Sequence, residues 1–119
     1  MRVLLADDQV EVRSALRFLL EQEPEIDVVG ETSEARDLLR QVEIAQPDLV
    51  LLDWELPGSL VANLLFALRT CRAQMKVIAL SGRPEARGEA LAAGIDGFVS
   101  KGDPPEHLLT ALHTCGRLC

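Results

Sequence analysis

Positive charge and long apolar runs are both scarce in this chain. Lysine and arginine together number 12 against 19 acidic residues, which leaves a formal net charge of −7. A protein contacts nucleic-acid phosphates through a basic patch, so this composition argues against direct nucleic-acid binding by this segment. No apolar run approaches the roughly 20 residues that a membrane-spanning helix needs. The sequence therefore predicts neither a nucleic-acid-binding segment nor a membrane segment.

Cysteine is sparse as well. The three cysteines, Cys71, Cys115 and Cys119, are odd in number and show no disulfide-framework spacing, which favours reduced thiols. Met1 and Arg2 lead directly into an apolar run, which leaves no room for a signal peptide. Both features predict a cytoplasmic protein.

The length and the remaining composition predict one globular domain. A chain of 119 residues is long enough for one hydrophobic core but not for two. Apolar residues make up 48% of the chain, which is too high a share for a disordered segment. No internal repeat, low-complexity tract or linker divides the sequence. We therefore expect a single domain over residues 1–119, with no effector domain in this chain.

Strand-like runs alternate with helical patterns along the whole chain. The expected strands are short and largely apolar: Arg2–Ala6, Asp27–Glu31, Asp48–Leu52, Met75–Leu80 and Ile95–Ser100. The expected helices are Gln9–Glu23, a helix capped by Ser33, a helix opened by Ser59 or Leu60, a helix from Pro84 to Gly94, and a last helix starting at Pro104 and Pro105. Strands that alternate with helices in this way predict an α/β protein with a parallel sheet and right-handed crossovers.

Charged side chains stand where three of these strands end. Asp7 and Asp8 follow the first strand, Asp53 follows the third, and Lys101 follows the fifth. The carboxyl ends of parallel strands meet at one sheet edge, where ligands bind in open α/β folds. Clustered carboxylates repel one another unless a cation shares the site, and oxygen ligands suit Mg²⁺. A lysine offers a positive charge to an incoming anion. These residues predict a site that binds Mg²⁺ and accepts a phosphoryl group on Asp53.

Each candidate residue also has an ordinary structural interpretation. Asp7 and Asp8 alone could be solvated loop acids or a helix cap, and Lys101 could be a surface residue. Ser81 could cap the fourth helix, and Phe98 could be part of the core. The functional interpretation is favoured because these residues occur together, in order, at predicted strand ends.

Two other features have weaker functional interpretations. His107, His113, Cys115 and Cys119 could form a metal cluster, but polar residues near a chain end are usually solvated and nothing closes a four-ligand site. Trp54 follows Asp53 directly, and we expect it to be half-exposed at the mouth of the site without a chemical role.

Four motifs at the strand ends resemble the receiver domain of bacterial two-component response regulators. They are Leu4-Leu5-Ala6-Asp7-Asp8, Asp53-Trp54-Glu55-Leu56-Pro57-Gly58, Ala79-Leu80-Ser81-Gly82, and the run from Ala93 to Lys101. The resemblance extends over the whole chain. The Val28-Val29-Gly30-Glu31 strand and the Gly-Phe-Val-Ser-Lys ending look most like the NarL/FixJ branch of transcriptional regulators.

The resemblance implies a fold and a set of residue roles. The fold would be flavodoxin-like: a single doubly wound five-stranded parallel sheet of order 2-1-3-4-5 with five helices. Asp53 would be the phosphoacceptor, with a sensor histidine kinase or a phosphotransfer protein as the donor. Mg²⁺ would be held by Asp8, Asp53 and the backbone carbonyl of Glu55, with Asp7 helping through a water molecule.

Other residues would carry the response to phosphorylation. In the family pattern Lys101 contacts the phosphoryl group, Ser81 hydrogen-bonds to it after transfer, and Phe98 is the rotating switch aromatic. A new phosphoryl group brings charge and strong acceptors, so a nearby hydroxyl can be drawn to it. Glu55 and Arg83 lie two residues beyond the phosphoacceptor and Ser81. We expect these two side chains to approach across the mouth of the site and tune the access of water.

These roles predict a phosphorylation-activated signalling switch and not a metabolic enzyme. Its catalysis would be limited to self-directed phosphotransfer and autodephosphorylation, with transcription as the regulated output. Phosphorylation is expected to favour a homodimer, and a DNA-binding effector domain would lie outside this chain.

Two alternative functions remain at this point. The segment from Ser81 to Lys101 is shorter than is usual in the family, which leaves open a receiver-like domain that acts by phosphorylation-independent partner binding or self-association. A small-molecule phosphohydrolase uses similar carboxylates, but it normally needs a cap or an extra acid for which this chain has little room.

Overall fold

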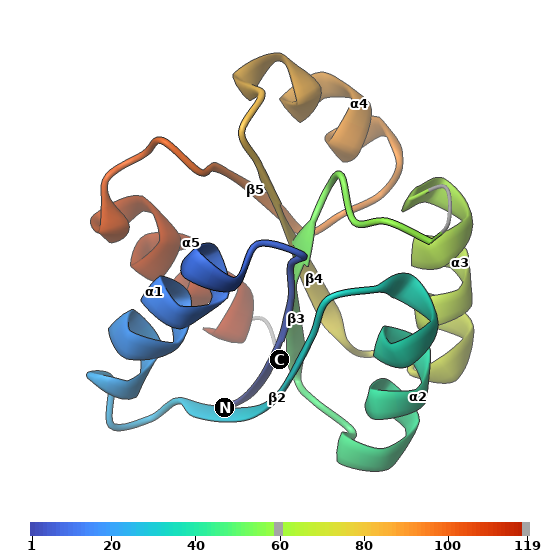
Figure 1. Cartoon of the computed structure of the whole chain (residues 1–119), viewed down its shortest axis with the longest axis horizontal. Helices are drawn as coiled ribbons and strands as arrows, with labels where there is room; N and C mark the ends of the chain where they lie inside the picture. Colours follow the sequence, from blue (N-terminus) through green and yellow to red (C-terminus); the bar gives the residue numbers. More distant parts are fainter. Residues whose placement is uncertain (59–60, 118–119) are drawn as a thin grey trace.

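The computed structural model describes residues 1–58 and 61–117, which form a parallel sheet covered by helices on both faces (Figure 1). The strands are β1 (Arg2–Ala6), β2 (Asp27–Thr32), β3 (Leu49–Asp53), β4 (Lys76–Ser81) and β5 (Gly97–Ser100). The helices are α1 (Val10–Glu21), α2 (Ala35–Ala45), α3 (Val61–Cys71), α4 (Arg87–Ala92) and α5 (Pro105–Arg117), with a 3₁₀ turn η1 (Pro84–Ala86). The strand order is β2-β1-β3-β4-β5, so the expected flavodoxin-like α/β fold is confirmed.

The central strand β3 separates two hydrophobic clusters. Leu49 and Leu51 belong to a cluster that includes residues of α1 and α5, whereas Val50 and Leu52 belong to a cluster that includes residues of α2, α3 and α4. All residues of β3 are buried, because helices cover both faces of a parallel sheet. Figure 1 shows the same division, with α1 and α5 on one side of the sheet and α2 and α3 on the other.

The strands β3 and β4 end one residue later than the sequence predicts. Asp53 and Ser81 are therefore the last residues of their strands. The backbone pairing even continues past them, because the Trp54 N–H donates to the Leu80 carbonyl at 2.7 Å and the Lys101 N–H donates to the Ser81 carbonyl at 2.8 Å. This pairing fixes the backbone of the candidate residues at the carboxyl edge of the sheet.

The expected end of the first helix was wrong. Helix α1 ends at Glu21, because the N–H groups of Gln22 and Glu23 donate to carbonyls only three residues back, at Leu19 and Leu20. This tightening closes the last turn before the chain enters the segment that leads to β2.

The predicted cap of the second helix was also wrong. Glu34 and not Ser33 occupies the N-cap position of α2, and no side chain among the described residues caps it. The start of α2 is instead fixed by the Ala35 N–H, which donates to the Pro57 carbonyl at 3.1 Å. The predicted start of the third helix at Ser59 or Leu60 lies outside the described residues.

The stretch between Ser81 and Lys101 contains the shortest helix. Helix α4 has only six residues, and it follows η1 directly. Gly94 ends this region with a φ of 97°, a left-handed conformation that glycine adopts without strain.

No helix in residues 1–58 and 61–117 is both long enough and apolar enough to cross a membrane.

Candidate functional site

Three carboxylates meet at the edge where β1 and β3 end. Asp7 and Asp8 follow β1, Asp53 ends β3, and one oxygen from each lies within 4.8 Å of the others. Asp7 and Asp53 are buried, whereas Asp8 is exposed. Each buried aspartate accepts a hydrogen bond from the backbone N–H two residues later: Asp7 from Gln9 and Asp53 from Glu55, both at 2.9 Å. The local turns therefore hold both buried carboxylates in place.

Lys101 lies between the two buried carboxylates. Its Nζ is 2.8 Å from Asp7 Oδ2 and 3.5 Å from Asp53 Oδ1, and it donates to Gln9 Oε1 at 3.0 Å. The structure thus brings the acids of β1 and β3 together with the lysine that follows β5.

The site carries an excess of negative charge. Burial, together with the charge of Asp7, raises the pKa of Asp53 to about 6, although the Glu55 N–H hydrogen bond and the Lys101 charge oppose this rise. Burial alone would lower the pKa of Lys101, but its contacts with Asp7 and Asp53 outweigh that effect and raise the pKa. A single lysine cannot neutralise three acids, so the site attracts a further cation.

The arrangement of oxygens fits a small divalent cation. Asp7 Oδ2 is buried, and its polar neighbour is Lys101 Nζ at 2.8 Å, an ion pair that leaves the oxygen room for a second partner. Such an oxygen keeps unused acceptor capacity. Beside it opens a pocket of about 320 Å³, lined by Asp8, Gln9, Asp53, Glu55, Gly82 and Lys101. An oxygen-only ligand set with room for water is what Mg²⁺ prefers.

Ser81, Glu55 and Arg83 form a closed set of hydrogen bonds beside the acids. The Ser81 hydroxyl lies 3.0 Å from each carboxylate oxygen of Glu55 and donates to that carboxylate. The Arg83 N–H donates to Ser81 Oγ at 3.0 Å, and the Arg83 guanidinium donates to Glu55 Oε2 at 3.0 Å. Glu55 and Arg83 therefore approach each other as the sequence predicts, as a partly exposed ion pair.

Comparison with protein families matches residues 3–113 to the response regulator receiver domain. The chain belongs to this family. Among curated proteins, the receiver domain is similar to the nitrate/nitrite response regulator protein NarL of Escherichia coli (strain K12). The two are 36% identical over 113 residues, which cover 93% of this chain and 52% of NarL. The chain spans about half the length of the curated relatives it matches.

Solved structures show the same relationship. The signal receiver domain of the putative response regulator NarL from Mycobacterium tuberculosis superposes with a TM-score of 0.87 at 27% identity, covering 98% of this chain and 95% of that one. RcsB from Salmonella enterica serovar Typhimurium, bound to promoter rprA in the presence of the phosphomimetic BeF₃⁻, gives a TM-score of 0.88 at 25% identity. That match covers 98% of this receiver domain and 62% of the RcsB chain.

Phe98 lies beneath α4 and is not at the surface. Its side chain is 7% exposed and belongs to the same cluster as Ala86, Ala90 and Ile95. The guanidinium of Arg87 lies over the ring, 5.4 Å from its centroid, a distance that permits a cation–π contact. No sequence pattern predicts this Arg87 contact, because the two residues are 11 positions apart and belong to different elements.

The prediction that Trp54 is half-exposed was wrong. The residue is only 4% exposed, and its indole N–H donates to Glu89 Oε1 of α4 at 3.2 Å. The alternation of Leu52, Trp54 and Leu56 was the missed signal, since all three pack in the same cluster. The residue next to Asp53 is thus linked directly to α4.

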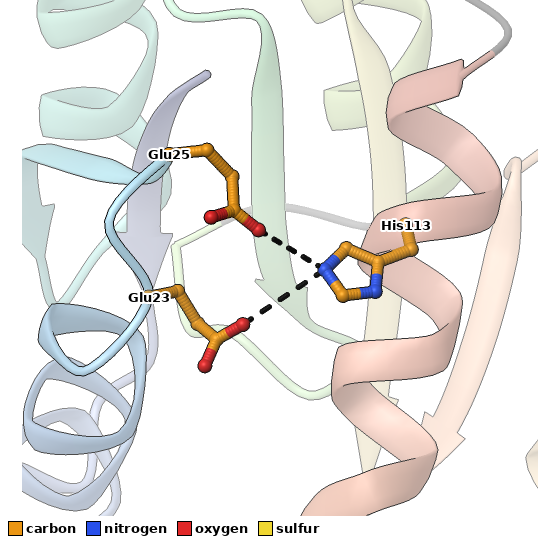
Figure 2. A group of neighbouring side chains, drawn as sticks. All are labelled: Glu23, Glu25 and His113. Carbon is orange, nitrogen blue, oxygen red and sulfur yellow. Dashed lines mark hydrogen bonds and ion pairs between the residues drawn. The ribbon is translucent and has the colours of Figure 1, made fainter.

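A second polar cluster lies at the opposite edge of the sheet. Figure 2 shows His113 of α5 facing Glu23 and Glu25 from the segment that precedes β2; His113 Nε2 is 3.9 Å and 3.2 Å from their carboxylate oxygens. A hydrogen bond from its own backbone N–H and the contact with His113 hold the pKa of Glu25 below its ordinary value. His107 pairs instead with Asp103 at 3.3 Å.

An apolar groove lies apart from the acidic cluster. It has a volume of about 560 Å³ and lies between α1 and α5, with Phe18 and Leu108 in its walls and Lys101 at its edge. Its lining offers no cluster of catalytic side chains comparable to the one around Asp53.

Proposed function

We propose that this receiver domain is a phosphorylation-activated signalling switch that accepts a phosphoryl group on Asp53. The observation that carries the proposal is the placement of the buried Asp53 carboxylate beside Asp7, Asp8 and Lys101 at the carboxyl edge of the sheet. The proposed donor is a sensor histidine kinase or a phosphotransfer protein, with Mg²⁺ as the required cofactor.

The proposed transfer is a displacement at phosphorus. A carboxylate oxygen of Asp53 forms the new O–P bond while the bond from phosphorus to the donor's histidine nitrogen breaks, and that nitrogen keeps the electron pair. Lys101, already 3.5 Å from Asp53 Oδ1, would turn one of its N–H groups to a phosphoryl oxygen. Asp8, Asp53 and the Glu55 carbonyl would hold Mg²⁺, with Asp7 acting through water. When bound, the cation supplies positive charge to the phosphoryl oxygens.

The response is proposed to pass from Ser81 to α4. Ser81 would leave its present partner and donate to the phosphoryl group, which opens space next to Phe98. Phe98 packs under α4, so a movement of its ring changes the support of that helix. Glu55 and Arg83 are proposed to tune the access of water to the acyl phosphate. In this proposal catalysis stays self-directed, limited to accepting the group and losing it slowly to water.

Transcription is the proposed output. Support comes from RcsB, which was solved on promoter DNA in the presence of a phosphomimetic and matches this chain over its receiver part. Because the chain covers about half of its curated relatives, we propose that the DNA-binding effector domain lies outside it. A homodimer formed on phosphorylation is the proposed route from α4 to that output.

Phosphorylation with acetyl phosphate and Mg²⁺ tests the proposal. Intact mass should rise by one phosphoryl group in the parent protein and should not rise in Asp53→Asn. Asp27→Asn, which changes an exposed aspartate at the start of β2, is the matched control and should be modified like the parent. Equal modification of Asp53→Asn and the parent would refute the assignment of the phosphoacceptor.

A further inference from the structure

We propose that the Glu55 side chain is a latch that holds Ser81 in the resting state and sets how easily the receiver domain switches. This inference rests on the proposed function and adds a positioning role for a residue otherwise considered only for its backbone carbonyl and for the access of water. The latch is defined here as the contact between the Glu55 carboxylate and the Ser81 hydroxyl.

The Ser81 hydroxyl has one proton, and that proton is committed to Glu55. The side chain is fully buried, and its Oγ is 3.0 Å from both Oε atoms of Glu55. A hydroxyl is a single donor. Ser81 therefore cannot donate to a phosphoryl group on Asp53 until it leaves Glu55, so the two acceptors compete for one proton.

Arg83 keeps the latch closed from the other side. Its backbone N–H donates to Ser81 Oγ, and its guanidinium donates to Glu55 Oε2, each at 3.0 Å. One residue thereby holds both the Ser81 hydroxyl oxygen and the Glu55 carboxylate to which that hydroxyl donates. The guanidinium and the Glu55 carboxylate are 50% and 40% exposed, so the pair can open toward solvent without leaving a buried charge unpaired.

The charge of a phosphoryl group supplies the force that opens the latch. The Glu55 N–H donates to Asp53 Oδ1 at 2.9 Å, so the backbone of Glu55 adjoins the phosphoacceptor carboxylate. A phosphoryl group on Asp53 carries nearly two negative charges, which repel the Glu55 carboxylate and offer Ser81 a stronger acceptor. The Glu55 carboxylate thus stabilises the resting state before transfer and moves away from Ser81 after it.

A latch of this kind lowers the apparent affinity of any phosphoryl mimic. If binding requires a released Ser81, the apparent affinity is the intrinsic affinity multiplied by the fraction of molecules in which the Ser81 hydroxyl is already free. A small free fraction therefore weakens binding. Removing the Glu55 carboxylate should increase that fraction. The resulting gain in affinity depends on the Ser81 hydroxyl. A gain caused by simple repulsion between Glu55 and the mimic would not depend on it.

Beryllofluoride binding in Mg²⁺ provides the test, followed by the fluorescence of Trp54, the only tryptophan. Glu55→Ala should tighten binding about tenfold, which corresponds to about 1.4 kcal/mol. The same substitution in a Ser81→Ala background should give a clearly smaller gain, because only the charge repulsion remains to be relieved and no hydroxyl is held. Glu85→Ala removes a nearby exposed carboxylate and is the matched control; it should bind like the parent.

Two results would overturn the latch. One is an unchanged affinity in Glu55→Ala. The other is an equal gain with and without Ser81, which would assign the effect to charge repulsion alone. Glu55→Gln adds a check, because its amide oxygen can still accept from Ser81, so its gain should be smaller than that of the alanine variant.

Amide exchange separates the latch from the proposed function. In the metal-free protein, Glu55→Ala should speed exchange of the Arg83 N–H, which donates to Ser81 Oγ, and should leave the Lys76–Ser81 strand protected. If the parent does not bind beryllofluoride, the proposed function fails, and faster Arg83 exchange still establishes the latch. If beryllofluoride binds and Arg83 exchange is unchanged, the latch fails alone.

Discussion

Neutralising Asp53 should stabilise the metal-free receiver domain. Burial, opposed in part by the Glu55 N–H hydrogen bond, raises the pKa of Asp53 from 3.8 to about 6. Each pKa unit corresponds to 1.36 kcal/mol, so the ionised carboxylate disfavours the folded state by about 3 kcal/mol. Asp53→Asn removes the charge but keeps the shape and the Oδ1 acceptor. We expect this variant to be about 2–3 kcal/mol more stable than the parent at pH 7.5 in EDTA.

The difference in unfolding free energy between Asp53→Asn and the parent should increase as pH rises. An acid whose pKa is higher in the folded state binds more protons when folded, so the stability of the parent falls as pH rises from about 4 to about 6. Asp53→Asn lacks this group. The stability difference between variant and parent should therefore be small near pH 4 and reach its full value above pH 6.

Urea unfolding followed by Trp54 fluorescence measures both quantities. Asp27→Asn, at an exposed aspartate of β2, is the matched control and should show little difference from the parent. Saturating Mg²⁺ should reduce the difference between Asp53→Asn and the parent, because the cation compensates the buried charge. If Asp53→Asn is no more stable than the parent at pH 7.5 in EDTA, then Lys101 already compensates the carboxylate and the reasoning from burial is wrong.

Two further outcomes are expected from the same geometry. Mg²⁺ should alter the fluorescence of Trp54, which is buried next to Asp53, and an Asp8→Asn variant should lose this response; a titration that is unchanged in the variant would remove Asp8 from the metal site. Beryllofluoride should change amide exchange most between Gly82 and Gly94, because α4 is short, contains Gly88 and packs mainly through alanine. A change confined to α1 and α2 would place the output on another face.

The sequence predicted the acidic site because strand ends determine it. Apolar runs that stop at Asp53 or just before Asp7 identify buried parallel strands, and such strands must end at a common edge. Lys101 could be placed by the same rule. The strand boundaries were correct to within two residues, and the strand order followed from the family resemblance.

Contacts between side chains from distant elements were harder to predict. The hydrogen bond between Trp54 and Glu89 depends on where α4 packs against β5, which no local pattern specifies. The pairing of His113 with Glu25 joins residues 88 positions apart. Ser33 was expected to cap α2 because serine is a common cap, but a backbone contact with Pro57 fixes that helix start instead. The intrinsic preference of a residue for a cap position is weak, and tertiary hydrogen bonds override it.

The division of the core by the sheet has a consequence for how this protein can diverge. Side chains of α1 and α5 meet one face of β3, and side chains of α2, α3 and α4 meet the other, so the two layers share a backbone but few side-chain neighbours. Substitutions in separate layers should then combine nearly additively. The α4 layer, which contains Phe98 and Trp54, can accumulate substitutions while the α1–α5 layer keeps its packing, and the reverse holds equally. One fold can in this way acquire new inputs and new outputs by separate mutational routes.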